Sequence, residues 1–171
     1  MSESQKWWRL PWVQNLAWVL LFLVIFFSVR AWQQQTMPKG QAPAITSTST
    51  VSGKPIDLAG YRGKPMMLYF WATWCRICEF EQGSIRAISR DYPVLSVALQ
   101  SGGVTQVSDY MKQHDLHMPT IVDEFGEIAN RYGVKGTPSA FFIDASGAIR
   151  SIEVGYTSEI GMRIRLWLAK L

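Results

Sequence analysis

The sequence predicts an α/β domain with a central mixed β-sheet and helices on both faces, preceded by one N-terminal transmembrane helix. Three observations support this prediction: a long uncharged stretch near the N-terminus, a strand-helix-strand pattern in the middle of the chain, and two β-type runs followed by a helical pattern near the C-terminus. Because a single core is typically built from roughly 100 to 150 residues, the 171 residues have room for one domain and an additional segment.

The N-terminal segment is apolar, with no charged residue from Leu10 to Val29, between Arg9 and Arg30. A helix of about 20 residues reaches about 30 Å, which is the thickness of the hydrocarbon layer of a bilayer. A cleaved secretory signal and a buried soluble helix are the alternatives, since the uninterrupted apolar part from Leu16 to Phe27 is short. Arg30 stands where a cleavage site would need a small residue, so we expect an uncleaved anchor.

These features divide the chain into four parts. We expect residues 1–9 to form a short cytoplasmic head, 10–31 the transmembrane anchor, 32–44 a polar tether and 45–171 the α/β domain. The basic residues on the two sides of the span only slightly favour a cytoplasmic N-terminus. The head is too short to hold a domain, so the α/β domain should be the exported part.

The charge of the exported part argues against one class of partner. From residue 31 onward the chain has 14 Lys and Arg against 12 Asp and Glu, which accounts for +2 of the formal net charge of +4. These residues contain no basic run interleaved with aromatic side chains. The sequence therefore gives no support to nucleic-acid binding.

The first half of the domain reads as strand, helix and strand. Residues 65–72, PMMLYFWA, form an apolar run typical of a strand buried on both faces. A helix with a stripe toward the core is predicted from residue 75 to about residue 90, and a second strand, VLSVAL, over 94–99. The stripe consists of Ile77, Glu81, Ile85 and Ile88. Because these elements form a βαβ unit, the two strands should be parallel.

The second half of the domain contains helices and a hairpin. After a glycine-containing loop we expect helices over 104–114 and around 126–132. Two β-type runs, SAFFID at 139–144 and AIRSIEVG at 148–155, flank the turn ASG and predict an antiparallel hairpin. The predicted sheet is therefore mixed, with a βαβ half, a ββα half and a helical insertion between them.

The last stretch, TSEIGMRIRLWLAKL at 157–171, predicts an amphipathic helix. Two hydroxyl residues at its start, Thr157 and Ser158, can cap it. Its apolar face consists of Ile160, Ile164 and Leu168. We expect this face to close the domain.

The stretch WATWCRIC at 71–78 contains the only two cysteines of the chain, Cys75 and Cys78. At i and i+3 of a helix, their β-carbons lie roughly 5 to 6 Å apart, which is near disulfide range. The helix N-terminus and Arg76 both favour a thiolate at Cys75. Cys75 is therefore the expected nucleophile, and Cys78 is the expected partner that resolves a mixed disulfide.

Other readings of the cysteine pair stay open. A structural zinc site would need His114 and His117 as further ligands, but their spacing is shorter than usual, and we expect both to be solvated or to pack in loops. The reduced pair alone can bind a soft ion such as Cu(I) weakly. A buried structural disulfide or a pair of inert thiols is a further alternative, although a bridge that closes so short a loop adds little stability.

Two more residues have candidate roles at this site. Glu81 follows Cys78 by one turn on the apolar stripe, so burial should raise its pKa and let it relay the proton of Cys78; a surface glutamate is the alternative. Pro138, in VKGTPSAFF, immediately precedes a predicted strand. A trans proline is allowed there, whereas a cis bond would present the Thr137 backbone to a substrate chain.

The residues GKPIDLAGYRGKPMMLYFWATWCRICEFE at 53–81, GVKGTPSAFFID at 133–144 and Gly155 form a joint pattern. Together with the apolar N-terminal segment, this pattern resembles the membrane-anchored, extracytoplasmic thioredoxin-fold proteins of the TlpA, ResA and DsbE group. Within that group it is most similar to the type called suppressor for copper sensitivity D (ScsD). The resemblance covers residues 42–171 and implies a thioredoxin-like fold.

The resemblance also implies roles for individual residues. The implied catalytic residues are the redox-active disulfide pair Cys75 and Cys78, the acid Glu81 and the cis proline Pro138. The implied substrate-binding residues around the pair are Trp74, Arg76, Ile77 and Thr137. No metal and no cofactor other than the disulfide is implied. Tyr69 stands where cytosolic thioredoxins have a buried aspartate, which makes Glu81 the better candidate for proton handling.

The implied activity is that of a thiol:disulfide oxidoreductase, tethered as a single-pass protein of the bacterial inner membrane with its catalytic domain in the periplasm. Its implied partners are exported proteins with thiols or disulfides and a transmembrane electron donor of the DsbD or ScsB type. A copper-tolerance or cytochrome c maturation pathway would fit this role. A copper-binding module that uses reduced Cys75 and Cys78 is the alternative function.

Overall fold

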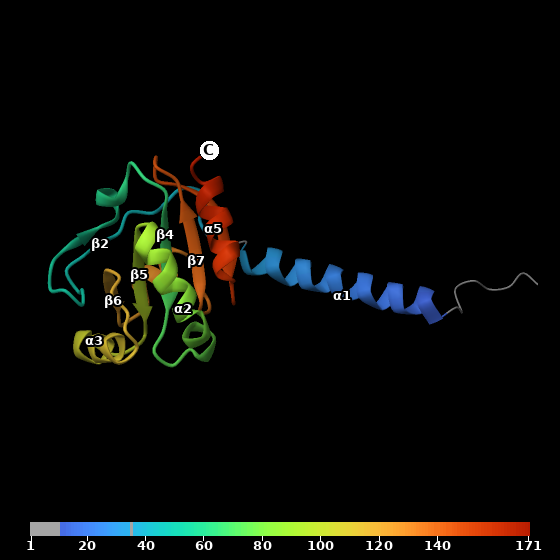
Figure 1. The fold of residues 1–171 in the computed structure, drawn as a ribbon, viewed down its shortest axis with the longest axis horizontal. Helices are drawn as coiled ribbons and strands as arrows, with labels where there is room; N and C mark the ends of the chain where they lie inside the picture. The colour runs from blue at the N-terminus through green and yellow to red at the C-terminus, as the bar shows by residue number, and fades with distance from the viewer. Residues whose placement is uncertain (1–10, 35) are drawn as a thin grey trace, which may run out of the picture. The chain divides into compact units, whose positions relative to one another are not determined.

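The computed structural model describes residues 11–34 and 36–171, and the chain divides into one unit that ends at residue 35 and a second unit, Thr36–Leu171. The first unit contains α1, Pro11–Gln34, drawn in blue in Figure 1. Among the described residues, no helix combines the length and the hydropathy that crossing a membrane requires. The predicted anchor is thus not confirmed, and the predicted head lies outside the described residues.

The second unit is built on a six-stranded mixed sheet with β4 near its centre, in the order β1-β8-β7-β4-β5-β6. β5 lies parallel to β4 and β7 lies antiparallel to it, as the βαβ unit and the hairpin predict. The strands are β1 (Gly40–Gln41), β4 (Met66–Trp71), β5 (Val94–Leu99), β6 (Thr120–Asp123), β7 (Ser139–Ile143) and β8 (Ala148–Val154). A separate two-stranded sheet consists of β2 (Thr46–Ser47) and β3 (Ile56–Asp57).

Helices cover both faces of the main sheet, as Figure 1 shows for α2 and α5 on one face. All side chains of β4 are buried, and because strand side chains alternate, they fill two cores. Tyr69 and Trp71 join α2, α3 and α5 in one core, whereas Leu68 and Phe70 join α4 in the other. The helices are α2 (Arg76–Asp91), α3 (Val104–Gln113), α4 (Glu127–Arg131), α5 (Glu159–Leu168) and the 3-10 turn η2 (Leu58–Tyr61).

The sequence reading differs from the structure at both edges of the sheet. The sequence analysis predicts no strand at Thr120–Asp123, where β6 pairs with β5. An apolar run this short predicts a strand only when the neighbouring strand edge is known. The sequence also predicts a tether up to residue 44, but from Thr36 this segment packs on the domain. Met37 is buried, and the Tyr132 hydroxyl donates to the Pro43 carbonyl at 2.5 Å. Apolar side chains in a polar stretch explain this packing.

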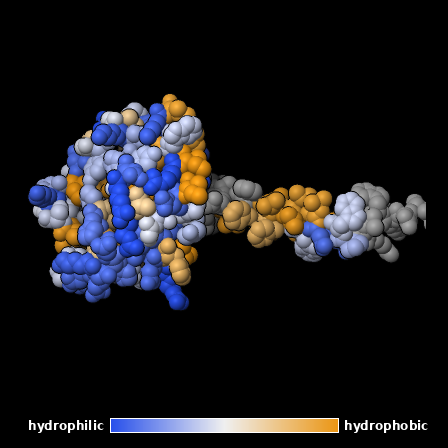
Figure 2. Space-filling view, viewed as in Figure 1, coloured by the Kyte–Doolittle hydropathy of each residue, from blue (hydrophilic) through white to orange (hydrophobic). Residues whose placement is uncertain are grey.

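The predicted inner face of the last helix is wrong. Ile160, Ile164 and Leu168 are exposed, whereas Met162 and Leu166 are buried. The helix carries apolar residues on two faces, and the observed orientation lets Arg165 on its flank pair with Glu153 of β8. Figure 2 shows the exposed apolar side chains gathered over α5 at the right edge of the domain. Ile77 of the predicted α2 stripe is likewise 47% exposed.

Candidate active site

Cys75 and Cys78 form a disulfide at the start of α2, with their Cα atoms 5.3 Å apart. Cys75 is the N-cap of the helix, and its Sγ accepts a hydrogen bond from the Cys78 backbone N–H at 3.1 Å. Both residues are buried, but 7% of Cys75 is exposed against 2% of Cys78. Cys75 is therefore the more accessible of the two.

The local sequence explains where the cysteines lie. Strand β4 ends at Trp71, and the Cys75 N–H donates to the Ala72 carbonyl at 3.2 Å to close the following turn. Helix α2 then begins at Arg76, whose side chain is exposed. Unpaired N–H groups and the positive end of the helix dipole favour negative charge at Cys75. This position stabilises a thiolate once the disulfide is reduced.

Glu81 is fully buried one turn after Cys78, so the alternative of a surface glutamate is wrong. Its Oε2 accepts from the Tyr69 hydroxyl at 3.1 Å, and its Oε1 accepts from the Thr157 backbone N–H. Burial raises the pKa of Glu81 from 4.5 to about 7, although both hydrogen bonds act to lower it. A carboxyl group with this pKa can take up and release a proton near neutral pH.

Neither hydrogen-bond partner of Glu81 can be predicted from the sequence alone. Tyr69 stands in the apolar run of β4, where its ring predicts burial but does not say what its hydroxyl contacts. Thr157 contacts Glu81 through its backbone, 76 residues further along the chain. No side-chain pattern reports a backbone donor, so only the fold reveals it.

Pro138 lies at the same end of the sheet as the cysteines. The Thr137–Pro138 peptide bond is cis, as the resemblance implies. Strand β7 begins at the next residue, Ser139, which pairs with Phe70 in antiparallel register. Pro138 is thus next to the end of β4 from which the chain turns toward Cys75. The Thr137 Oγ1 is buried and has no hydrogen-bond partner among the described residues.

Exposed apolar side chains surround the start of α2. Trp74 is 60% exposed, and its indole Nε1 donates to the Gln100 carbonyl at 3.0 Å, which fixes the ring. Ile77 and Phe80, three residues apart on the helix, are exposed as well. Phe80 has no role in the sequence prediction because it is out of phase with the buried stripe. These side chains offer an apolar surface beside the disulfide.

The two histidines do not join the cysteines. His114 Nδ1 lies 3.1 Å from Gln82 Oε1, and its ring stacks on Tyr110 with centroids 4.1 Å apart. His117 Nε2 pairs with Asp115 at 2.7 Å. Within residues 11–34 and 36–171, no cluster of three or more His, Cys, Asp or Glu side chains has the arrangement of a metal site.

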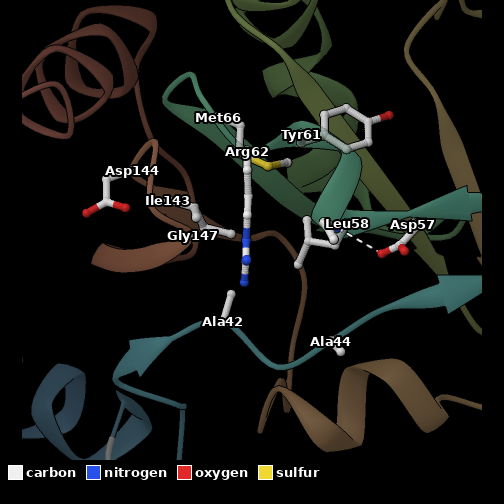
Figure 3. A pocket seen from close by; sticks show the side chains of 11 residues that line it. Ala42, Ala44, Asp57, Leu58, Tyr61, Arg62, Met66, Ile143, Asp144 and Gly147 are labelled. Carbon is white, nitrogen blue, oxygen red and sulfur yellow. Dashed lines mark hydrogen bonds between the residues drawn. The ribbon is translucent and has the colours of Figure 1, made fainter.

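A pocket of about 80 Å³ lies at the opposite end of β4, beside Met66 (Figure 3). Arg62 extends past Gly147 toward Ala42, as Figure 3 shows. Asp144 also lines this pocket, but its carboxylate is bonded to the Arg150 guanidinium at 2.6 Å. The pocket is therefore remote from the disulfide and adds no reactive group to it.

The fold and the site together define a thioredoxin-like protein, with a Cys-x-x-Cys disulfide at a helix N-terminus and a cis proline at the same end of the sheet. The chain belongs to the AhpC/TSA family, whose model matches residues 38–152. A solved thiol:disulfide interchange protein of the thioredoxin family from Chlorobium tepidum is 29% identical, with a TM-score of 0.65, over 77% of this chain and 97% of that one.

Two relatives show how far the likeness extends. A thioredoxin-like protein of Haemophilus influenzae is 36% identical over 110 residues, or 64% of this chain and 65% of the relative. Thiol-disulfide oxidoreductase ResA of Bacillus cereus is 34% identical over 113 residues, with the same two shares of 64% and 65%. The chain thus covers slightly less than two thirds of the length of these relatives.

Proposed function

We propose that this protein is a thiol:disulfide oxidoreductase that exchanges electrons with protein thiols through Cys75 and Cys78. The observation that carries the proposal is the disulfide at the N-terminus of α2, with Cys75 as N-cap and the buried acid Glu81 one turn beyond Cys78. Relatives named ResA and DsbE, which are called thiol-disulfide oxidoreductase and thiol:disulfide interchange protein, support the same activity.

The exchange proceeds in two steps. The Cys75 thiolate attacks one sulfur of a substrate disulfide, so that a Cys75–substrate bond forms and the substrate's other sulfur leaves as a thiolate. Cys78 then loses its proton and attacks the Cys75 sulfur, which releases the second substrate thiol. Two electrons have passed to the substrate, and the Cys75–Cys78 disulfide is restored. The same steps in reverse oxidise a substrate dithiol.

Glu81 handles the proton of Cys78 in this scheme. It is buried one helical turn from Cys78, and its pKa of about 7 matches a group that must accept and return a proton at neutral pH. Thr137 and Pro138 lie at the same end of the sheet and supply backbone for an extended substrate chain. Trp74 and Ile77 add apolar contacts, and Arg76 adds positive charge.

The location and partners are part of the proposal. The uncharged segment from Leu10 to Val29 supports a single-pass anchor in the bacterial inner membrane with the domain in the periplasm. Exported proteins with thiols or disulfides are then the substrates. When the protein acts as a reductase, a transmembrane donor of the DsbD or ScsB type must reduce it again. Membership in the ScsD type would place it in copper tolerance, and cytochrome c maturation is the other fitting pathway.

A disulfide-exchange assay on the full-length chain in detergent tests the activity. We expect the wild-type chain to accelerate exchange between glutathione and a disulfide-bonded unfolded protein at least tenfold over the uncatalysed rate, and the Cys75→Ser variant to lose this acceleration. Titration of the reduced chain with Cu(I) tests the alternative of a copper-binding module. Tight one-to-one copper binding without exchange activity would replace the proposed function.

A further inference from the structure

A small cavity lies between β4 and α2, next to Cys78. Its volume is about 10 Å³, and both Cys78 and Tyr69 line it. Glu81 does not belong to its wall, although it is the acid assigned to Cys78. A group of the wall that is bonded to Glu81 would connect this cavity with the Glu81 carboxylate.

The other polar side chains of the wall are already occupied. Gln82 donates through Nε2 to the Tyr110 hydroxyl at 2.9 Å, and its Oε1 contacts the ring of His114. Trp71 donates through Nε1 to Ser96 Oγ at 3.1 Å. None of these three bonds is made to Glu81. The Tyr69 hydroxyl is the group of the wall that is bonded to Glu81, to which it donates at 3.1 Å.

The chemistry of a phenol suits a connection of this kind. A tyrosine hydroxyl can donate one hydrogen bond and accept another at the same time. Tyr69 projects from β4 to the face that α2 covers, so its ring spans the distance between the helix and the sheet. Because the Tyr69 hydroxyl donates its hydrogen bond to Glu81, its oxygen keeps lone pairs that can accept a hydrogen bond from the Cys78 thiol.

We propose that the Tyr69 hydroxyl relays the proton between Cys78 Sγ and Glu81 Oε2 during resolution of the mixed disulfide, a role that rests on the oxidoreductase function proposed above. The Cys78 thiol gives its proton to the Tyr69 oxygen while the Tyr69 proton moves to Glu81. The resulting Cys78 thiolate attacks Cys75 Sγ, the bond between Cys75 and the substrate breaks, and the substrate thiolate leaves. The proton ends on Glu81, the Cys75–Cys78 bond replaces the bond between Cys75 and the substrate, and Tyr69 ends as a neutral phenol.

The surroundings of Tyr69 favour this concerted transfer. Burial, followed by the charge and hydrogen bond of Glu81 and the neighbouring Tyr110 of α3, raises the pKa of Tyr69 well above its usual value of 10. The phenol therefore stays protonated and does not act as a separate base. On the far side of Glu81, the Thr157 N–H before α5 holds the other carboxylate oxygen and leaves Oε2 to Tyr69.

Rapid-mixing kinetics on the reduced full-length chain test the relay. The probe is a glutathionylated peptide disulfide, and the two measured rates are formation of the Cys75 mixed disulfide and its resolution by Cys78. We expect Tyr69→Phe to leave the first rate unchanged and to slow the second at least tenfold. Glu81→Gln should slow it similarly, and the double variant no further, because both groups act in one path. Additive losses would overturn the relay.

A pH profile separates a relay from a residue that only lowers the pKa of Glu81 through its hydrogen bond. If Tyr69 acts only in this way, resolution in Tyr69→Phe recovers to the wild-type rate at a pH where Glu81 is fully ionised, and the relay is wrong. The relay predicts that the slowing persists there. Tyr132→Phe is the matched control, because it removes a buried hydroxyl from the other core, where Tyr132 donates to the Pro43 carbonyl. Its resolution rate should equal that of the wild type.

The same traces keep the two proposals distinguishable. If the wild-type chain forms no mixed disulfide at Cys75, the oxidoreductase function itself fails. If the wild type forms and resolves the intermediate and Tyr69→Phe does so at the same rate, the function stands and the relay is overturned. The circular dichroism spectrum and the thermal unfolding midpoint of each variant show whether a slow rate reflects misfolding. The kinetic comparison applies to a Tyr69→Phe chain whose spectrum and midpoint match those of the wild type.

Discussion

The backbone N–H of Thr157 donates to Oε1 of Glu81, so that the segment entering α5 holds the acid of α2. Tyr69 of β4 bonds the other carboxylate oxygen. One carboxyl group thereby ties together the sheet and two helices in the core. Burial among these elements makes Glu81 a neutral-pH acid, although the two hydrogen bonds act to lower its pKa, and it also makes the protonation of Glu81 part of the stability of the domain.

The first prediction concerns stability against pH. Because burial raises the folded-state pKa of Glu81 from 4.5 to about 7, the folded chain holds a proton that the unfolded chain has lost between these values. The contribution of Glu81 to the free energy of unfolding is fully present below about pH 4.5. It falls by about 3 kcal/mol as the pH rises through about 7. Chemical denaturation of wild type and Glu81→Gln from pH 4 to 8 measures it, and the variant should lack this decline. An equal decline in both would contradict the assignment.

Asp144 should show the opposite pH dependence. Burial alone would raise its pKa, but hydrogen bonds from Ser146, Ala148 and Arg150 lower it from 3.8 to about 2. These bonds close the turn between β7 and β8. Their contribution is present above pH 3.8 and is lost as pH falls toward 2, by about 2 kcal/mol. Asp144→Asn should destabilise the domain at pH 7 and match the wild type near pH 2 in urea titrations.

The reactivity of Cys75 gives a third prediction. The reduced protein should react with iodoacetamide at neutral pH at least tenfold faster at Cys75 than at Cys78, because the helix N-terminus stabilises the Cys75 thiolate. Arg76→Glu should slow the reaction at Cys75 several-fold, since it replaces the exposed positive charge with a negative one. Lys112→Glu, an exposed charge change on α3, is the matched control and should leave the rate unchanged. Peptide mass spectrometry after timed quenching measures each rate.

Substitution of one exposed and one buried phenylalanine distinguishes a role in substrate docking from a role in core stability. Phe80 is 78% exposed beside the disulfide, whereas Phe142 is fully buried in β7. Phe80→Ala should change the unfolding free energy by less than about 0.5 kcal/mol and raise the KM for a protein substrate, because apolar contact area is lost. Phe142→Ala should cost about 3 to 5 kcal/mol because it leaves a cavity. Urea denaturation and steady-state kinetics of both variants check this, and an unchanged KM in Phe80→Ala would remove Phe80 from the docking surface.

The sequence predicts the fold correctly where the apolar patterns are long. The apolar runs at β4 and β5 predict two buried parallel strands, and the helix predicted between them places Cys75 at its N-terminus, where the structure has it as the N-cap. Short elements such as β6 escaped because their strand character comes from the neighbour they pair with. The orientation of α5 escaped for a different reason, since two of its faces are apolar and only tertiary packing selects one.

The candidate site likewise has a part that the sequence predicts and a part that only the fold reveals. The spacing of Cys75, Cys78 and Glu81 along one helix follows from the sequence, because three and four residues make one turn. The partners of Glu81 do not, since Tyr69 reaches it across the core and Thr157 reaches it through a backbone N–H. Contacts between segments far apart in the chain depend on the fold, and side-chain type alone does not report them.

Trapping of the mixed disulfide tests the central claim most directly. The full-length Cys78→Ser variant is reduced, mixed with a disulfide-bonded unfolded protein and examined by peptide mass spectrometry. We predict that substrate accumulates covalently on Cys75, because the residue that resolves the intermediate is missing, whereas the Cys75→Ser variant accumulates far less. Equal trapping in both variants, or trapping in neither, would contradict an exchange in which Cys75 attacks and Cys78 resolves.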